Sequence, residues 1–153
     1  MLEAQDERVL AQLQRDARAT NQELADTVGM STSACWRCVR ALEDEGVIRR
    51  YTALVDREKA GFDMSAIIHV SLERHDTSFV ETFVSRVTAR AEVLDCFATT
   101  GDADYHLRVV TRDMHAYNRF LEDFMFRLPG IKHVRSNVIL KEIKLEASLP
   151  FDK

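Results

Sequence analysis

Two helix-start signals, separated by one short turn, dominate the first third of the chain. Thr20 is followed three residues later by Glu23, the spacing of a capping box, in which each side chain satisfies an otherwise unpaired backbone amide. Gly29 predicts the end of this helix, because glycine adopts the left-handed conformation without a steric penalty. Ser31 predicts the start of a further helix, which should end near Gly46. Two capped helices joined by so short a turn indicate a helix-turn-helix.

The helix that begins at Ser31 has two distinct faces when its residues are spaced at 100°. One face is apolar and is expected to pack on the preceding helices, the first of which spans about residues 3–16; this face carries Cys35, Cys38, Val39 and Leu42. The opposite face and the helix start carry hydroxyl, aromatic and basic side chains, namely Ser31, Thr32, Ser33, Trp36, Arg37 and Arg40. Arginine pairs bidentately with guanine, and hydroxyls reach phosphates or bases. We therefore predict that these six residues contact double-stranded DNA, with an ordinary solvated helix face as the alternative.

The charge of the chain limits how many phosphates it contacts. The formal net charge is -4 at pH 7, and residues 1–60 carry nine Lys and Arg against eleven Asp and Glu. The basic residues Arg37, Arg40, Arg49 and Arg50 cluster, but the acidic run 43–45 interrupts them. So small a patch predicts weak non-specific binding and strong salt sensitivity. Several copies in one assembly would multiply the phosphate contacts.

The second half of the chain alternates between strand and helix patterns. Strands are predicted over 64–72, 93–99, 103–110 and 134–145, and helices over 79–87 and 114–128. The order βαββαβ is that of a ferredoxin-like sheet with two helices on one face. The other face then needs cover, for which a second copy of the chain is the simplest source.

The domain organisation follows from these elements. A short strand is expected over residues 47–55, followed by a connector in which Gly61 marks the boundary. We predict an α+β chain with three parts: a winged-helix-like helix-turn-helix domain over 1–50, a strand and linker over 51–63, and a ferredoxin-like effector-binding and oligomerisation domain over 64–153.

Several motifs together resemble one family over nearly all of residues 2–147. They are Asp6-x2-Val9-Leu10, Asn21-x2-Leu24-Ala25, Val28-Gly29-Met30-Ser31, Cys35-x-Arg37-x-Val39-Arg40, Gly101-Asp102-Ala103-Asp104-Tyr105 and Leu128-Pro129-Gly130-Ile131. In these the chain resembles the leucine-responsive regulatory protein/AsnC family of feast/famine regulators. The resemblance implies a sequence-specific transcription regulator of amino-acid metabolism genes that forms homodimers and often octamers. It also implies a small-molecule effector, usually an amino acid, bound between C-terminal domains.

The effector-binding residues implied by the resemblance are Gly101, Asp102, Asp104 and Tyr105. A free amino acid needs backbone amides for its carboxylate and an acidic side chain for its ammonium group, and a Gly-Asp turn supplies both. Taken without the resemblance, these residues favour a simple hairpin turn in which Asp102 caps its own backbone. Ala103 stands where relatives often carry an aromatic residue.

Cysteines and histidines show no metal or catalytic spacing. Cys35-x2-Cys38 lacks a second pair and faces the predicted core, so both thiols are expected to be structural, as is Cys96. The histidines are scattered at positions 69, 75, 106, 115 and 133, and His69 and His106 are expected on a sheet face near an interface. We predict neither a metal, a cofactor nor a catalytic residue, and therefore no enzyme.

Three features of the sequence favour a cytoplasmic location. No apolar run reaches the roughly 18 residues of a membrane span, the N-terminus is acidic, and the number of cysteines is odd, which together favour the cytoplasm. One rival is a small-molecule sensor that has lost DNA binding. The other is an enzyme built on the ferredoxin-like half.

Overall fold

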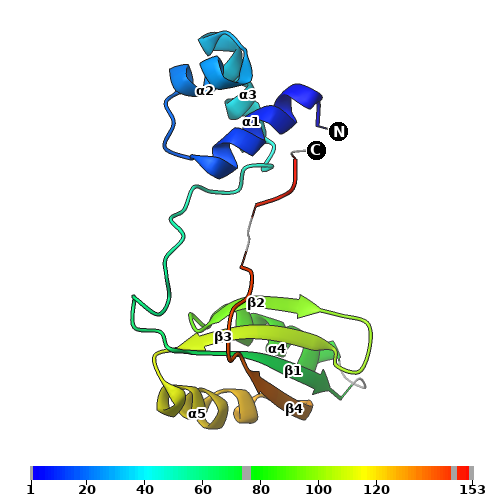
Figure 1. The fold of residues 1–153 in the computed structure, drawn as a ribbon. Coiled ribbons are helices and arrows are strands. Elements are labelled where there is room, and N and C mark those ends of the chain that lie inside the picture. The colour runs from blue at the N-terminus through cyan, green and yellow to red at the C-terminus, as the bar shows by residue number, and fades with distance from the viewer. Residues whose placement is uncertain (1, 74–76, 146–147, 152–153) are drawn as a thin grey trace. The chain divides into compact units, whose positions relative to one another are not determined.

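The computed structural model describes residues 2–73, 77–145 and 148–151, which fall into two compact units (Figure 1). The N-terminal unit comprises residues 1–54 together with 144–153, and the C-terminal unit comprises residues 55–143. No helix in the described part of the chain is long and apolar enough to cross a membrane.

The described residues of the N-terminal unit form three helices, α1 (Ala4–Arg15), α2 (Asn21–Val28) and α3 (Thr32–Asp44). The capping box predicted at the start of α2 is present, and Ser31 caps α3. The apolar faces of the three helices meet in one core, formed by Val9, Leu10, Leu24, Ala25, Val28, Cys35 and Leu42. The predicted helix-turn-helix is thus confirmed.

In its described residues, the C-terminal unit is a four-stranded antiparallel sheet with two α-helices and one short 3-10 helix. Its elements are β1 (Met64–Leu72), α4 (Thr77–Thr88), β2 (Val93–Ala98), β3 (Tyr105–Thr111), α5 (Met114–Asp123), the short 3-10 helix η1 (Met125–Arg127) and β4 (Ile131–Val138). The strand order is β2-β3-β1-β4. This confirms the predicted ferredoxin-like fold.

The core of the C-terminal unit lies between the sheet and its helices. Alternate residues of the central strand β1 are buried there: Met64, Ala66, Ile68, Val70 and Leu72. Phe83 of α4 and Tyr117 and Phe120 of α5 pack against them, so both helices cover the same face. The intervening residues of β1 point to the other face, because side chains alternate along a strand.

The turn between η1 and β4 requires a glycine at position 130. Gly130 has a φ of +74°, and a Cβ atom there would lie only 2.6 Å from the ring of Phe79. Both the left-handed backbone and the close approach of Phe79 therefore exclude a larger side chain.

One strand prediction is wrong and a second is wrong in part. Residues 47–55 have no regular secondary structure, and β4 ends at Val138 rather than near Leu145. A strand needs a neighbour to pair its backbone groups, and no strand of the described residues pairs with 47–55 or 140–145. The apolar residues that suggested strands are instead exposed: Leu54 to 81%, Leu140 to 96% and Ile143 to 83%.

The units divide the chain differently from the predicted domains, since residues 144–153 group with the helices. The side chain of Gln14 in α1 donates to the Leu149 carbonyl at 3.0 Å and accepts from the Leu149 amide at 2.6 Å. Phe151 packs against the helical core. Leu149 and Phe151 are therefore anchored by contacts with residues more than a hundred positions away.

Candidate DNA-binding and effector sites

The turn between α2 and α3 is held by specific hydrogen bonds. Gly29 adopts a φ of +73°, and the Met30 amide donates to the Ala25 carbonyl at 2.9 Å, which closes the end of α2. Thr32 Oγ1 at the start of α3 donates to Gln22 Oε1 of α2 at 2.7 Å. These bonds set the orientation of α3 relative to α2.

The hydroxyl groups predicted to meet DNA already have local roles at the start of α3. Ser31 Oγ accepts from the Ala34 amide at 3.3 Å and lies 3.4 Å from Ser33 Oγ. Thr32 is bonded to Gln22, as described above. Contacts of Ser31 or Thr32 with a phosphate would therefore replace existing bonds, whereas exposed Ser33 is the least committed of the three.

Trp36 and Arg37 project from the exposed face of α3. Trp36 is 54% exposed although its ring is large and apolar, while Cys35 beside it is fully buried. Arg37 is exposed and forms no ion pair with any described residue. An exposed tryptophan beside an unpaired arginine is typical of a surface that binds a partner.

Arg40, by contrast, is engaged by acidic neighbours. Its guanidinium lies 3.4 Å from Glu43 Oε2 and 3.4 Å from Asp44 Oδ1. The Tyr51 hydroxyl donates to Glu43 Oε1 at 2.9 Å, and burial together with this carboxylate raises the pKa of Tyr51 to about 12. Arg40 must leave these exposed pairs to reach DNA. The spacing of three and four residues was the available signal in the sequence.

The segment between β2 and β3 is held against the end of β1. The Asp104 amide donates to the Val70 carbonyl at 3.0 Å, and Asp104 Oδ2 accepts from the Leu72 amide at 2.9 Å. Ser71 Oγ donates to the Asp102 carbonyl at 3.3 Å. Asp104 thus extends the backbone pairing of β1, a structural role that the Gly-Asp turn motif does not predict.

Two of the predicted effector residues, Asp102 and Asp104, line an open cavity of about 620 Å³. Its other lining residues are Ser71, Leu72, Glu73, Lys132 and His133. The last two were not predicted; they reach the cavity because β4 pairs with β1, which places His133 opposite Ser71. The cavity therefore combines carboxylates with basic side chains.

The other two predicted effector residues, Gly101 and Tyr105, do not line this cavity. Gly101 is an exposed turn residue with a φ of +133°. The ring of Tyr105 packs on Phe83 in the core, with 4.8 Å between the ring centroids.

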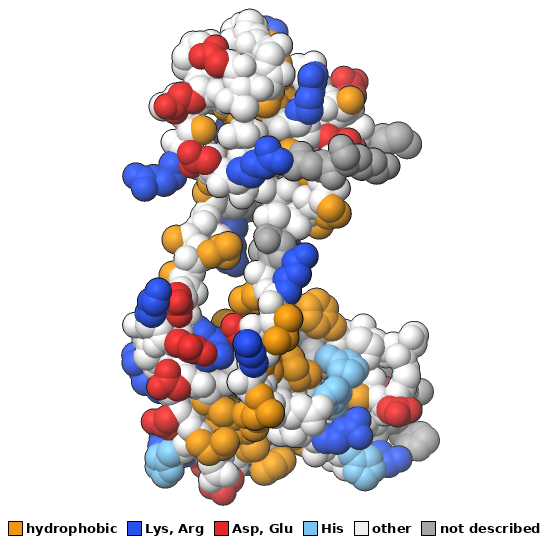
Figure 2. Space-filling view, viewed as in Figure 1, with side chains coloured by type: hydrophobic (Ala, Val, Ile, Leu, Met, Phe, Trp, Pro, Cys, Tyr) orange, Lys and Arg blue, Asp and Glu red, His pale blue; other side chains and the backbone are white. Residues whose placement is uncertain are grey.

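The face of the sheet away from the helices carries a row of aromatic and basic side chains. Strand register aligns Phe97, His106, His69 and Arg135 across this face. The rings of His69 and His106 lie edge to face at 4.6 Å, and Phe97 is 59% exposed. Burial, His106 and Arg135 lower the pKa of His69. Figure 2 shows hydrophobic side chains and histidines gathered on the visible face of the C-terminal unit.

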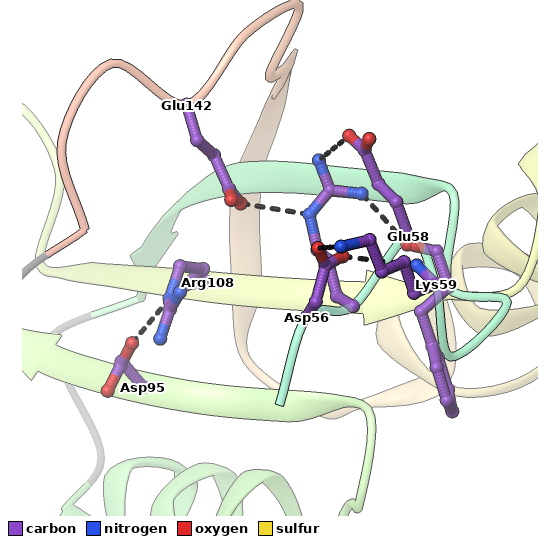
Figure 3. A network of polar contacts seen from close by, with 8 residues as sticks. Asp56, Glu58, Lys59, Asp95, Arg108 and Glu142 are labelled. Atoms are coloured by element: carbon purple, nitrogen blue, oxygen red, sulfur yellow. Dashed lines mark hydrogen bonds and ion pairs between the residues drawn. The ribbon is translucent and has the colours of Figure 1, made fainter. Parts of the chain in front are cut away.

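A second row on the same face contains an ion pair. Arg108 Nε lies 2.6 Å from Asp95 Oδ2, between neighbouring strands (Figure 3). Ile67 of β1 is the cross-strand partner of Arg108 of β3. His75, which the sequence analysis also considered, lies outside the described residues.

The cysteines have environments that keep their thiols neutral. Cys38 Sγ donates to Asp6 Oδ1 at 3.2 Å. The pKa of Cys38 is raised to about 12, mainly by burial and next by the Asp6 carboxylate. Burial also raises the pKa of Cys35 and of Cys96. Metal ligation and nucleophilic attack need the thiolate, so these groups are suited to packing. No group of three or more His, Cys, Asp or Glu within the described residues could hold a metal ion.

Both units of the chain match models of known protein families. Residues 2–49 match the model of a winged helix-turn-helix DNA-binding domain, and residues 65–149 match the Lrp/AsnC ligand binding domain. The chain is 37% identical over 145 residues to the Bkd operon transcriptional regulator of Pseudomonas aeruginosa, covering 95% of each protein. It is 34% identical over 152 residues to the DNA-binding transcriptional activator DecR of Escherichia coli, covering 99% of this chain and 100% of that protein.

A solved structure is similar over the whole chain. It is a transcriptional regulator of Neisseria meningitidis in complex with L-Met, with a TM-score of 0.92 and 38% sequence identity. The alignment covers 99% of this chain and 98% of that one.

Proposed function

The chain belongs to the Lrp/AsnC family of DNA-binding transcription regulators, and on this premise we propose that α3 enters the major groove with Trp36, Arg37 and Arg40 facing the bases. The observation that carries this proposal is the exposed, unpaired Arg37 beside exposed Trp36, opposite the buried face of the same helix. Ser31, Thr32 and Ser33, at the helix start, are assigned to phosphates.

The effector is assigned to the cavity beside the β2–β3 segment. Asp102 and Asp104 offer carboxylates to an ammonium group, and Lys132 and His133 offer basic groups to a carboxylate. This charge pattern is complementary to a free amino acid. The L-Met complex of the Neisseria meningitidis regulator makes L-methionine the first effector to test. Genes of amino-acid metabolism are the corresponding proposed targets.

The assembly is assigned to the exposed sheet face of the C-terminal unit and to the segment after β4. Phe97, His106 and His69 lie in a row on this face, and Leu140 and Ile143 of the same unit are exposed to 96% and 83%. Exposed apolar and aromatic side chains gathered in this way mark an interaction surface. A second copy of the chain covers this face in the proposed homodimer, which further contacts extend to an octamer. Effector binding then acts on DNA binding by changing the assembly.

We also propose that the protein is cytoplasmic and has no catalytic activity. The relatives are regulators rather than enzymes. The cysteine thiols, the strongest nucleophile candidates in the chain, are held neutral by burial.

To test the DNA proposal, the affinity of the full chain for the DNA upstream of its own gene is measured by fluorescence anisotropy at fixed salt. Arg37→Gln is expected to weaken specific binding by about 1–3 kcal/mol, because one base contact is lost. Arg86→Gln, which removes an exposed arginine from α4, is the matched control. Equal affinities of Arg37→Gln and wild type would refute the assignment, and no binding at all would favour a sensor that has lost DNA binding.

The effector proposal is tested by a thermal-shift screen of the common amino acids, followed by calorimetric titration with L-methionine. A ligand that binds the native state raises the midpoint of unfolding. The absence of a shift with every amino acid would refute this part of the function and leave the DNA assignment untouched.

A further inference from the structure

A second cavity, of about 640 Å³, lies in the C-terminal unit where β2 begins and β3 ends. The connector of residues 55–62 and one side of α5 border it. Its wall is mainly apolar and includes Val55, Phe62, Leu94, Val110, Ala116 and Phe120. It shares no lining residue with the cavity beside Asp104, and its size is typical of sites for small organic ligands.

Positive charge exceeds negative charge in this cavity. Its charged lining residues are Arg57, Arg90, Arg112, Arg119, Glu92 and Asp123. Arg112 and Arg119 form no ion pair with any residue that the structure describes. The guanidinium of Arg112 lies 5.0 Å from the centroid of the Phe62 ring, at the wall of the cavity.

The other charged side chains of the cavity form ion pairs, either with each other or with residues outside the cavity. Arg57 Nε lies 2.9 Å from Glu142 (Figure 3) and Arg90 Nη2 lies 2.6 Å from Glu92. Asp123 is 3.3 Å from Arg127. Two unpaired guanidinium groups over an apolar wall therefore remain to attract an anion.

Arg90 packs on aromatic side chains beside the cavity. Its guanidinium stacks on the rings of Phe120 and Phe124, at 5.8 and 4.8 Å from their centroids. Its Nε atom is buried and has no hydrogen-bond acceptor among the described residues. An atom without accessible surface does not face the open cavity, so Arg90 shapes the wall by packing and leaves the anion to Arg112 and Arg119.

We propose that this cavity binds an organic carboxylate with an apolar body. The carboxylate contacts Arg112 and Arg119, and the body lies on the wall formed by Phe62, Leu94 and Phe120. A free amino acid fits less well, because its ammonium group would meet arginines while Glu92 is already paired with Arg90. The site is thus chemically distinct from the effector cavity and does not depend on it.

The connector gives such a ligand a route to the DNA-binding unit. Val55 and Phe62 belong to the wall, and residue 55 directly follows the last residue of the first segment of the N-terminal unit. Arg57 holds the connector in place by donating to the Phe62 carbonyl at 2.8 Å. An occupant that packs on Val55 and Phe62 therefore restricts the chain that leads to α3.

Methyl NMR on the full chain, labelled at alanine, locates the binding. The probe is 3-phenylpropanoate, and the neutral 3-phenylpropanamide is its matched control. Ala60, Ala91 and Ala116 line the cavity, whereas Ala103 lies in the β2–β3 segment beside the effector cavity. The carboxylate is expected to shift the first three methyl signals and leave Ala103 unchanged. Equal shifts with the amide, shifts at Ala103 alone, or no shift at millimolar carboxylate would overturn the proposal.

Variants test the chemistry of the site by calorimetric titration with the same probe. Arg112→Gln and Arg119→Gln should each weaken binding by about tenfold or more, because a charge-assisted hydrogen bond is lost. Ala116→Leu should weaken carboxylate binding by filling the cavity while keeping all charges. Arg86→Gln removes an exposed arginine that lies outside the cavity and should bind like wild type. Unchanged binding in both arginine variants, or equal weakening in Arg86→Gln, would refute the assigned role of these side chains.

Discussion

The carboxylate of Asp104 accepts a hydrogen bond from the backbone amide of Leu72 at 2.9 Å. This bond ties the segment between β2 and β3 to the last residue of β1. A residue assigned to effector binding therefore also supports the fold, and the two roles need different substitutions to separate them.

Asp104→Ala should lower the free energy of unfolding by about 1–3 kcal/mol, because the Leu72 amide loses its acceptor in a half-buried place. Asp104→Asn keeps an oxygen acceptor and should lose much less. Both variants should lose affinity for L-methionine if the carboxylate meets the ammonium group. Urea unfolding followed by circular dichroism and calorimetric titration measure the two effects. An alanine variant as stable as wild type would show that the bond to Leu72 contributes nothing.

Glu43→Gln should tighten DNA binding by up to about tenfold, since it frees Arg40 from one carboxylate and reduces repulsion of phosphates. The glutamine still offers an oxygen to the Tyr51 hydroxyl, so the local structure should be kept. Fluorescence anisotropy at fixed salt measures the change. Glu81→Gln on α4 removes the same charge from the other unit and should leave the affinity unchanged. Weaker binding by Glu43→Gln would mean that its pair with Arg40 positions the arginine for DNA.

Phe97→Asp should reduce the mass of the assembly, because it places a charge on the exposed sheet face proposed as the interface. Phe97 is 59% exposed in the single chain, and Met114 at the start of α5 is exposed to nearly the same extent, 56%. Met114→Asp is thus a control for a surface charge outside that face. Light scattering coupled to size-exclusion chromatography gives the masses. An unchanged mass for Phe97→Asp would exclude the open sheet face as the dimer contact.

Asp6→Asn should accelerate alkylation of Cys38, because it removes the carboxylate that, after burial, contributes most to the raised pKa. Cys38 titrates near a pKa of about 12 in the folded chain and near 9.0 ordinarily. The folded state therefore retains the proton longer, and the free energy of unfolding should fall as the pH rises through that window.

Mass spectrometry of iodoacetamide-treated native protein at pH 8 measures the alkylation rate. Cys96, in the other unit, is the internal control and should react equally in both variants. If Cys38 reacts no faster in Asp6→Asn than in wild type, burial alone controls its reactivity.

Local patterns in the sequence were sufficient to predict the fold of each half of the chain. The capping box at Thr20, the glycine turn at Gly29 and the two faces of α3 depend on residues within a few positions of one another, and all are present. The alternation along β1 and the helical spacing in α4 and α5 likewise identified the ferredoxin-like order of elements. Their physical causes, capping and periodic burial, are visible in a short window.

The sites depended on contacts that a short window does not contain. Strand register alone brings Lys132 and His133 to the cavity beside Asp104, and it turns Tyr105 toward Phe83 instead. The failed prediction of a strand over 47–55 has a related cause, since a strand forms only where another strand satisfies its backbone.

The same division applies to the helix-turn-helix with which the chain begins. Residue order is enough to identify the exposed side of α3, because helical periodicity separates the two faces. The folded structure was needed to show that Arg37 is unpaired while Arg40 is held by Glu43 and Asp44. It also shows that Glu43 is shared with Tyr51. Pairing of charges is set by distances of a few ångströms between side chains, which residue order constrains but does not specify.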